Sequence, residues 1–129
     1  LFGLPTKGGT LTINGGNITG NHSDDRGGAI YSEAPYTSID IYGGKITGNT
    51  AEYGGAIALN GSIASFHNGE VSGNSATECG GAFYCYDGGF VIIDGSTVVS
   101  NNTAPYGGCA YVDGMSSDLY FYSGYIENN

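Results

Sequence analysis

Apolar residues in this chain recur as short runs, each bounded by glycine, asparagine or serine. In Ile39-Asp40-Ile41 the apolar positions alternate with a polar one, and Leu11-Thr12-Ile13 shows the same order earlier in the chain. Alternation with a period of two predicts β-strands that bury one face. No segment sustains the 3.6-residue period of an amphipathic helix, so the pattern predicts an all-β chain.

These runs belong to a unit that occurs five times. Each copy ends on an asparagine, and successive asparagines are separated by 28, 25, 28 and 27 residues. They are Asn21, Asn49, Asn74, Asn102 and Asn129. A glycine pair follows in the first four copies, at Gly27-Gly28, Gly54-Gly55, Gly80-Gly81 and Gly107-Gly108. A repeat of 20–50 residues is typical of stacked-repeat architectures.

Each copy contains three strand-like runs. The first follows the glycine pair, as at Ala29-Ile30-Tyr31, the second is the Ile39–Ile41 type, and the third precedes the asparagine, as at Ile46-Thr47. This order predicts a right-handed parallel β-helix, a solenoid of about five coils of 25–28 residues with three short strands per coil. Residues 1–129 then form a single β-helix repeat domain, which we interpret as a fragment of a longer repeat protein.

The period-two rule also assigns the side chains that should point inward. In the second strand they are Leu11, Ile39, Ala64, Val91 and Leu119, with Ile13, Ile41, Phe66, Ile93 and Phe121. In the third strand they are Ile18, Ile46, Val71, Val99 and Ile126. In the first strand they are Ile30, Ile57, Phe83 and Ala110, with Leu59, Cys85 and Val112. The five asparagines are expected to stack as a ladder of paired amides.

The outward columns are rich in aromatic residues. Tyr31, Tyr84 and Tyr111 form one line on the first strand, which Ala58 interrupts. Tyr42, His67, Asp94 and Tyr122 form a second line, with Tyr120 beside it. Tyrosine offers a large contact area with a hydrogen-bonding tip, so these rows are a candidate surface for a protein or a glycan. The alternative is that stacked aromatics only stabilise neighbouring strands.

Two motifs recur together in successive copies, as in Ile46-Thr47-Gly48-Asn49 followed by Gly54-Gly55-Ala56-Ile57. This pairing resembles the repeats of polymorphic outer-membrane-protein passengers and related bacterial adhesin-like β-helix proteins. Those passengers usually carry phenylalanine at the position three residues before the asparagine, where this chain has isoleucine or valine. The resemblance implies an extracellular or bacterial cell-surface location, in an autotransporter or wall-anchored protein, and a role in adhesion to a host or neighbouring-cell protein or glycan.

The amino-acid composition limits the classes of partner that this chain can bind. The formal net charge is -9, and the only basic residues are Lys7, Arg26 and Lys45. Phosphate recognition needs clustered lysine and arginine, so the charge balance argues against nucleic acid and anionic membranes as partners. No run of 18 apolar residues is present, so this chain contains no membrane-spanning segment, and no signal peptide is visible.

The sequence gives little support for catalysis, a cofactor or a metal. A carbohydrate-active enzyme remains the rival class because many β-helices are lyases or hydrolases, and Asp40 with Asp94 is the one conceivable carboxylate pair. Asp24 and Asp25 form an acidic turn that is a weak candidate for a cation. The three cysteines fall in different columns, which predicts three free thiols.

The sequence therefore favours a non-catalytic structural and adhesive module of a bacterial surface or secreted protein. Besides the enzyme fragment, a self-assembling filament subunit stays open. Nothing in the sequence closes the end coils, and uncapped strands can pair with another chain, so end-to-end self-association is a possible partner interaction.

Overall fold

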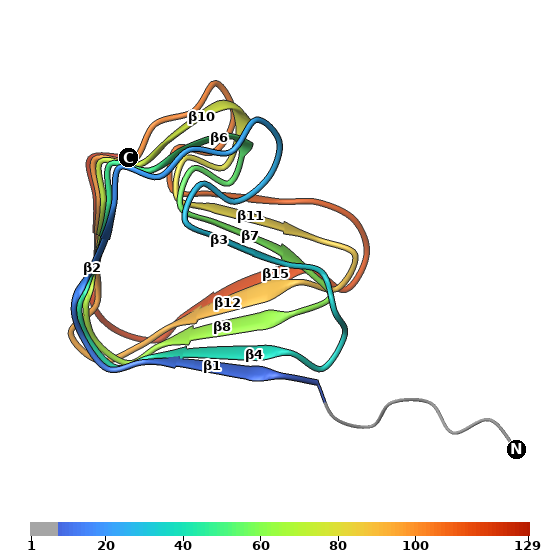
Figure 1. Cartoon of the computed structure of the whole chain (residues 1–129), viewed down its shortest axis with the longest axis horizontal. Helices are drawn as coiled ribbons and strands as arrows, with labels where there is room; N and C mark the ends of the chain where they lie inside the picture. Colours follow the sequence, from blue (N-terminus) through green and yellow to red (C-terminus); the bar gives the residue numbers. More distant parts are fainter. Residues whose placement is uncertain (1–7) are drawn as a thin grey trace, which may run out of the picture.

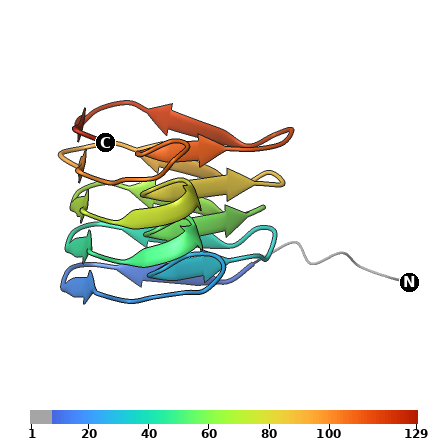
Figure 2. The same cartoon turned by 90° about the horizontal axis from the view of Figure 1, so that it is seen from above.

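The computed structural model describes residues 8–129, which form a parallel β-solenoid (Figure 1). Lys7 and the other residues of the 1–129 domain that precede it lie outside the described part. Every regular element in residues 8–129 is a β-strand, which confirms the all-β prediction. Seen from above, the coils lie over one another as layers of similar shape (Figure 2).

The strands form three long sheets and one short one. Sheet 1 contains β1 (Thr10–Ile13), β4 (Ser38–Ile41), β8 (Ile63–Phe66), β12 (Phe90–Ile93) and β15 (Asp118–Phe121). Sheet 2 contains β2 (Asn17–Thr19), β5 (Lys45–Thr47), β9 (Glu70–Ser72), β13 (Val98–Ser100) and β16 (Tyr125–Glu127). Sheet 3 contains β3 (Ile30–Ser32), β7 (Ile57–Asn60), β11 (Phe83–Tyr86) and β14 (Ala110–Val112). The short sheet, which we call the flap, contains β6 (Thr50–Tyr53) and β10 (Ser75–Cys79).

Strand pairing follows the columns that the repeat alignment predicts. Ile39 pairs in parallel with Leu11 on one side and Ala64 on the other, and Phe83 pairs with Ile57 and Ala110. The same residue of each copy therefore lies directly above its equivalent, at the strand spacing of about 4.8 Å.

Two details of the prediction are wrong. Sheets 1 and 2 have five strands but sheet 3 has four, so the described residues make about four turns rather than five. The number of strands per coil is also not always three, because in two coils the segment between the asparagine and the glycine pair forms β6 and β10. These segments are short and contain few large apolar residues, and their backbones pair with the neighbouring coil.

The inward columns form one core in the middle coils. Its largest fully buried side chains include Phe66, Phe83, Ile57 and Leu59, and burial of a side chain of this size contributes roughly 1.5–3 kcal/mol. In the outermost described coils the side chains of the same columns are exposed to solvent. Leu11 is 44% exposed and Phe121 is 48% exposed. Burial in a solenoid requires a coil on each side, as well as an inward direction.

A column of asparagines connects the coils at the end of sheet 2. The backbone N–H of Asn49 and its side-chain Nδ2 both donate to Oδ1 of Asn74, at 2.9 and 3.0 Å. Asn74 donates in the same way to Asn102. Equivalent bonds join Asn21 to Asn49 and Asn102 to Asn129. The three middle members are fully buried, so these hydrogen bonds satisfy polar groups that water cannot reach.

The two positions of the glycine pair require glycine for different reasons. Its first member has a positive φ, as at Gly54 (φ 67°), a conformation that other residues adopt only at a cost. Its second member lies where two coils approach closely. A Cβ on Gly55 would lie 2.3 Å from the carbonyl oxygen of Gly81. The pair therefore turns the chain and lets the next coil pack against it.

Candidate binding surfaces

The outward side of sheet 1 carries one of the two predicted aromatic lines. The N–H of Tyr42 donates to the carbonyl of Ile13, and the N–H of His67 donates to that of Ile41, which places the two side chains in one column. Their rings stack with centroids 4.6 Å apart and planes 14° apart. Because coils rise by about 4.8 Å, the rings lie one above the other and present their edges to solvent.

The same side holds further aromatic residues at its C-terminal end. Tyr122 is 69% exposed and its ring is nearly parallel to that of Tyr120, with centroids 6.3 Å apart. Phe90 meets Tyr120 edge to face at 6.0 Å. We call this surface the aromatic face. It consists of Tyr42, Ile63, His67, Phe90, Ile92, Asp94, Tyr120 and Tyr122.

Sequence reasoning missed three members of this surface. Ile63, Phe90 and Ile92 lie on the outer side of sheet 1 and are half-buried, at positions where earlier copies carry threonine, serine or aspartate. A signal was present, because residues 90–93 are a continuous apolar run where the equivalent strands alternate. A strand that is apolar on both sides either is covered or offers a contact surface.

Carboxylates lie along this face. Asp94 accepts hydrogen bonds from the Ser123 hydroxyl and the Gly95 N–H, both at 2.7 Å, and these two bonds hold the pKa of Asp94 below its usual range. Asp40 lies 3.9 Å from the Nε2 atom of His67. Glycoside hydrolysis needs a general acid that keeps its proton, so an ionised Asp94 is poorly suited to that role.

The other predicted aromatic line is mostly covered. Tyr84 was expected to face solvent, but it is only 7% exposed, so that expectation is wrong. The reason is the flap, whose Tyr53 packs on Tyr84 with ring centroids 5.1 Å apart, while Tyr111 stacks on it at 6.0 Å. Burial raises the pKa of Tyr84 to about 12. Tyr31 remains 42% exposed, but its hydroxyl is 2.9 Å from that of Tyr86.

Arg26 fixes the first coil to this tyrosine cluster. Its guanidinium lies over the rings of Tyr53 and Tyr86, with distances of 5.6 and 5.2 Å to the ring centroids. Asp25 pairs with it at 2.8 Å. Cation–π contacts of this kind are worth about 0.5–2 kcal/mol. The outer side of sheet 3 therefore serves internal packing and presents little free aromatic surface.

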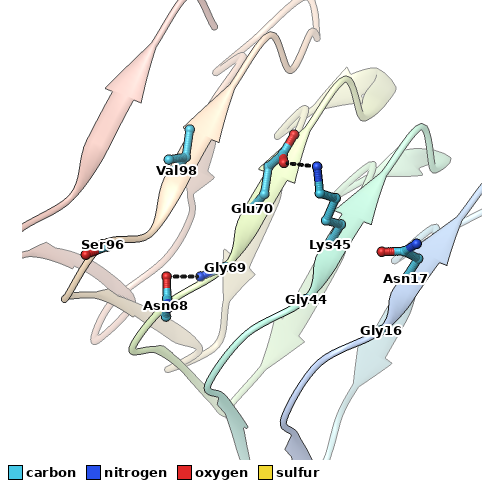
Figure 3. Close-up of a pocket in the computed structure, with 9 residues that line it drawn as sticks. All are labelled: Gly16, Asn17, Gly44, Lys45, Asn68, Gly69, Glu70, Ser96 and Val98. Carbon is cyan, nitrogen blue, oxygen red and sulfur yellow. Dashed lines mark hydrogen bonds and ion pairs between the residues drawn. The ribbon is translucent and has the colours of Figure 1, made fainter.

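A groove follows the corner where sheet 1 passes into sheet 2 (Figure 3). Its volume is about 430 Å³. We call it the corner groove. Its lining comes from four successive coils and consists of Gly16, Asn17, Gly44, Lys45, Asn68, Gly69, Glu70, Ser96 and Val98. Lys45 and Glu70 form an ion pair of 2.8 Å, and the pKa of Glu70 is lowered, first by its hydrogen bond to Lys45 and then by that to Ser72.

The two carboxylates of the acidic turn each pair with a neighbouring side chain. Asp24 pairs with His22 at 2.9 Å, while Asp25 pairs with Arg26. Within residues 8–129, no group of three or more histidine, cysteine, aspartate or glutamate side chains lies close enough to hold a metal ion. Cys79, Cys85 and Cys109 are free thiols, and burial raises the pKa of Cys85 to about 12. In the same part of the chain, no helix is long and apolar enough to cross a bilayer.

Comparison with known proteins agrees with the resemblance read from the motifs. Residues 14–33 and 68–86 match the model of the Chlamydia polymorphic membrane protein repeat. Each segment ends in sheet 3, and the two together include members of sheet 2 and the asparagine ladder. No curated protein and no solved structure matches the chain. Two segments of this chain are therefore similar to that surface-associated repeat, and the described residues have a parallel β-solenoid fold.

Proposed function

We propose that this chain is a non-catalytic adhesive module of a bacterial cell surface, which binds a protein partner through the aromatic face. The observation that carries the proposal is that face itself. Tyr42, Tyr120 and Tyr122 are all more than two-fifths exposed on one sheet, whereas Tyr84 is only 7% exposed and packs against Tyr53 of the flap. The similarity to polymorphic membrane protein repeats supports the surface location and the adhesive role.

The make-up of the face suits protein recognition. Tyrosine provides contact area with few rotatable bonds, and aliphatic residues such as Ile63 and Ile92 add an apolar centre. The stacked rings of Tyr42 and His67 show their edges rather than their faces. A sugar ring stacks on an exposed aromatic face, so edge-on rings favour side-chain packing and hydrogen bonds from the tyrosine hydroxyls.

Charge indicates the kind of protein. Asp40, Asp94 and Asp118 lie on or beside the aromatic face. The two basic side chains of residues 8–129 are both paired with carboxylates, Arg26 with Asp25 and Lys45 with Glu70. A partner with a lysine- or arginine-rich rim around an apolar centre would be complementary, and its association would be faster at low salt.

Cell adhesion tests the proposal. Beads coated with the protein would be counted on epithelial cells and on bacterial cells, before and after the cells are treated with trypsin or with glycosidases. We expect saturable adhesion that trypsin abolishes and that 0.5 M salt weakens. The double substitution Tyr42→Ala/Tyr122→Ala should reduce the affinity by roughly 30-fold or more, the usual effect of removing a tyrosine at the centre of an interface.

The matched control is Tyr106→Ala, which removes another exposed tyrosine at the end of the flap region, away from sheet 1. If the double substitution leaves adhesion unchanged, the aromatic face is not the binding surface. Adhesion that survives trypsin but is lost after glycosidase treatment would replace the protein partner by a glycan. Circular dichroism of each variant checks that the solenoid is intact.

A further inference from the structure

We propose a second binding site: the corner groove takes an uncharged, linear polysaccharide that lies parallel to the solenoid axis. This site is separate from the aromatic face and does not rest on the proposed function. The lining comes from one coil after another, beginning at Gly16 and Asn17 and ending at Ser96 and Val98. The groove therefore extends along the stack, across four coils, and not across one sheet (Figure 3).

The floor of the groove is kept bare by glycine. Gly44 and Gly69 have φ values of 94° and 117°, which other residues rarely adopt. A Cβ on Gly44 would also lie 2.6 Å from the carbonyl oxygen of Gly16, and one on Gly69 would lie 3.0 Å from that of Gly44. In the second and third coils, side chains are thus excluded at this corner by the close approach of the coils, and the hollow there is a fixed feature of the backbone.

The wall of the groove offers hydrogen-bonding groups in each coil. Asn17 contributes an amide, Lys45 an ammonium, Glu70 a carboxylate and Ser96 a hydroxyl. Lys45 donates one of its three N–H groups to Glu70 and has two left. Within residues 8–129, the side chains of Asn17 and Ser96 form no hydrogen bond with other protein groups. Donors and acceptors for a hydroxyl-rich ligand are therefore present and unused.

The repeat of these groups identifies the class of ligand. Asn17, Lys45 and Glu70 share one column and recur with the coil at about 4.8 Å, and one ring of an extended β-linked glycan covers nearly the same length. In the fourth coil Val98 occupies this column, and the hydroxyl of Ser96 lies two residues before it. A peptide strand advances by about 3.3 Å per residue and would lose register with the coils.

Charge selects among polysaccharides. Glu70 lies in the groove, and the whole chain carries a net charge of -9, so a polyuronate would be repelled. Lys45 is already neutralised by Glu70. At the C-terminal end, Val98 is followed in the same column by Tyr125, which offers an apolar patch against which the carbon face of a sugar ring can pack.

Titration with defined oligosaccharides tests this site. Cellohexaose, chitohexaose and mannohexaose would be added in calorimetry, with hexagalacturonate as the anionic comparison. We expect at least one neutral hexasaccharide to bind and hexagalacturonate to bind more weakly or not at all. Affinity should rise from the disaccharide to the tetrasaccharide and then level off, because the groove crosses four coils.

Substitutions place the binding on the groove. Asn17→Ala and Glu70→Ala should each weaken binding roughly tenfold, since each removes a direct hydrogen-bonding group. Glu52→Ala is the matched control, because Glu52 lies in β6 of the flap. Tyr42→Ala/Tyr122→Ala should leave oligosaccharide binding unchanged, which separates this site from the aromatic face. The proposal fails if no neutral hexasaccharide binds at millimolar concentration, or if both groove variants bind like the unmodified protein.

Discussion

Replacing Asn74 by alanine tests how much the asparagine ladder stabilises the stack. The side chain of Asn74 takes part in four hydrogen bonds. Its Oδ1 accepts from the N–H and Nδ2 of Asn49, and its Nδ2 donates to the carbonyl of Ile46 and to Oδ1 of Asn102. All four bonds are buried.

The expected loss follows from these bonds. At about 1 kcal/mol net for each hydrogen bond, Asn74→Ala should lower the free energy of unfolding by about 4 kcal/mol. The N–H of Asn49 would then be buried without its acceptor, which adds to the cost rather than reducing it. The effect therefore comes from a polar residue and should be as large as the loss of a core side chain.

Asn21→Ala is the matched control in the same column. The Nδ2 of Asn21 donates to Asn49 at 3.0 Å and to Thr19 at 3.3 Å, and Asn21 itself is exposed. Water can replace those bonds, so we expect a loss of about 1 kcal/mol or less. Urea unfolding followed by circular dichroism gives both values. Equal losses at the two positions, or a loss below about 1 kcal/mol at Asn74, would refute the view that buried amide pairing stabilises the solenoid.

Two further predictions concern the backbone and the corner ion pair. Gly55→Ala should cost about 3 kcal/mol in urea unfolding, because its Cβ would lie 2.3 Å from the Gly81 oxygen, whereas Gly9→Ala meets no atom within 4 Å and should change stability by less than about 0.5 kcal/mol. Similar shifts for both would contradict close coil contact at Gly55. Glu70 has a lowered pKa, so its contribution should be present above the ordinary value of 4.5 and lost as the pH falls through the lowered folded-state pKa. Glu70→Gln should therefore differ from the unmodified protein by about 0.5 kcal/mol at pH 7 and by nothing at pH 2. A difference that persists at pH 2 would show that the carboxylate charge is not its source.

The fold was readable from the sequence because a solenoid repeats its local rules. The columns of Ile39 and Phe83 follow from alternation alone, and the structure pairs them with the residues that the alignment places above and below. The prediction of about five coils exceeded the structure by about one turn. The flap strands were not predicted, since the segments at β6 and β10 are short and carry few large apolar residues.

The candidate surfaces were readable only in part. Tyr42 and His67 were placed correctly in one column, because a column depends only on the repeat. Tyr84 was assigned to the surface because its position points outward, but outward is not the same as exposed. The flap of the same and neighbouring coils folds over that position. Phe90 was passed over because the strand was predicted to begin at Val91, whereas β12 begins at Phe90.

The sequence by itself determined the parallel stack, its inward columns and the positions of the asparagines and glycine pairs, because each of these depends on short spacing that recurs in every copy. Tertiary structure alone decided which outward side chains reach solvent. It buried Tyr84 under the flap, left Tyr122 open and formed the groove beside Lys45 and Glu70. Exposure depends on which other segments pack over a residue, and no alternation within a strand encodes that.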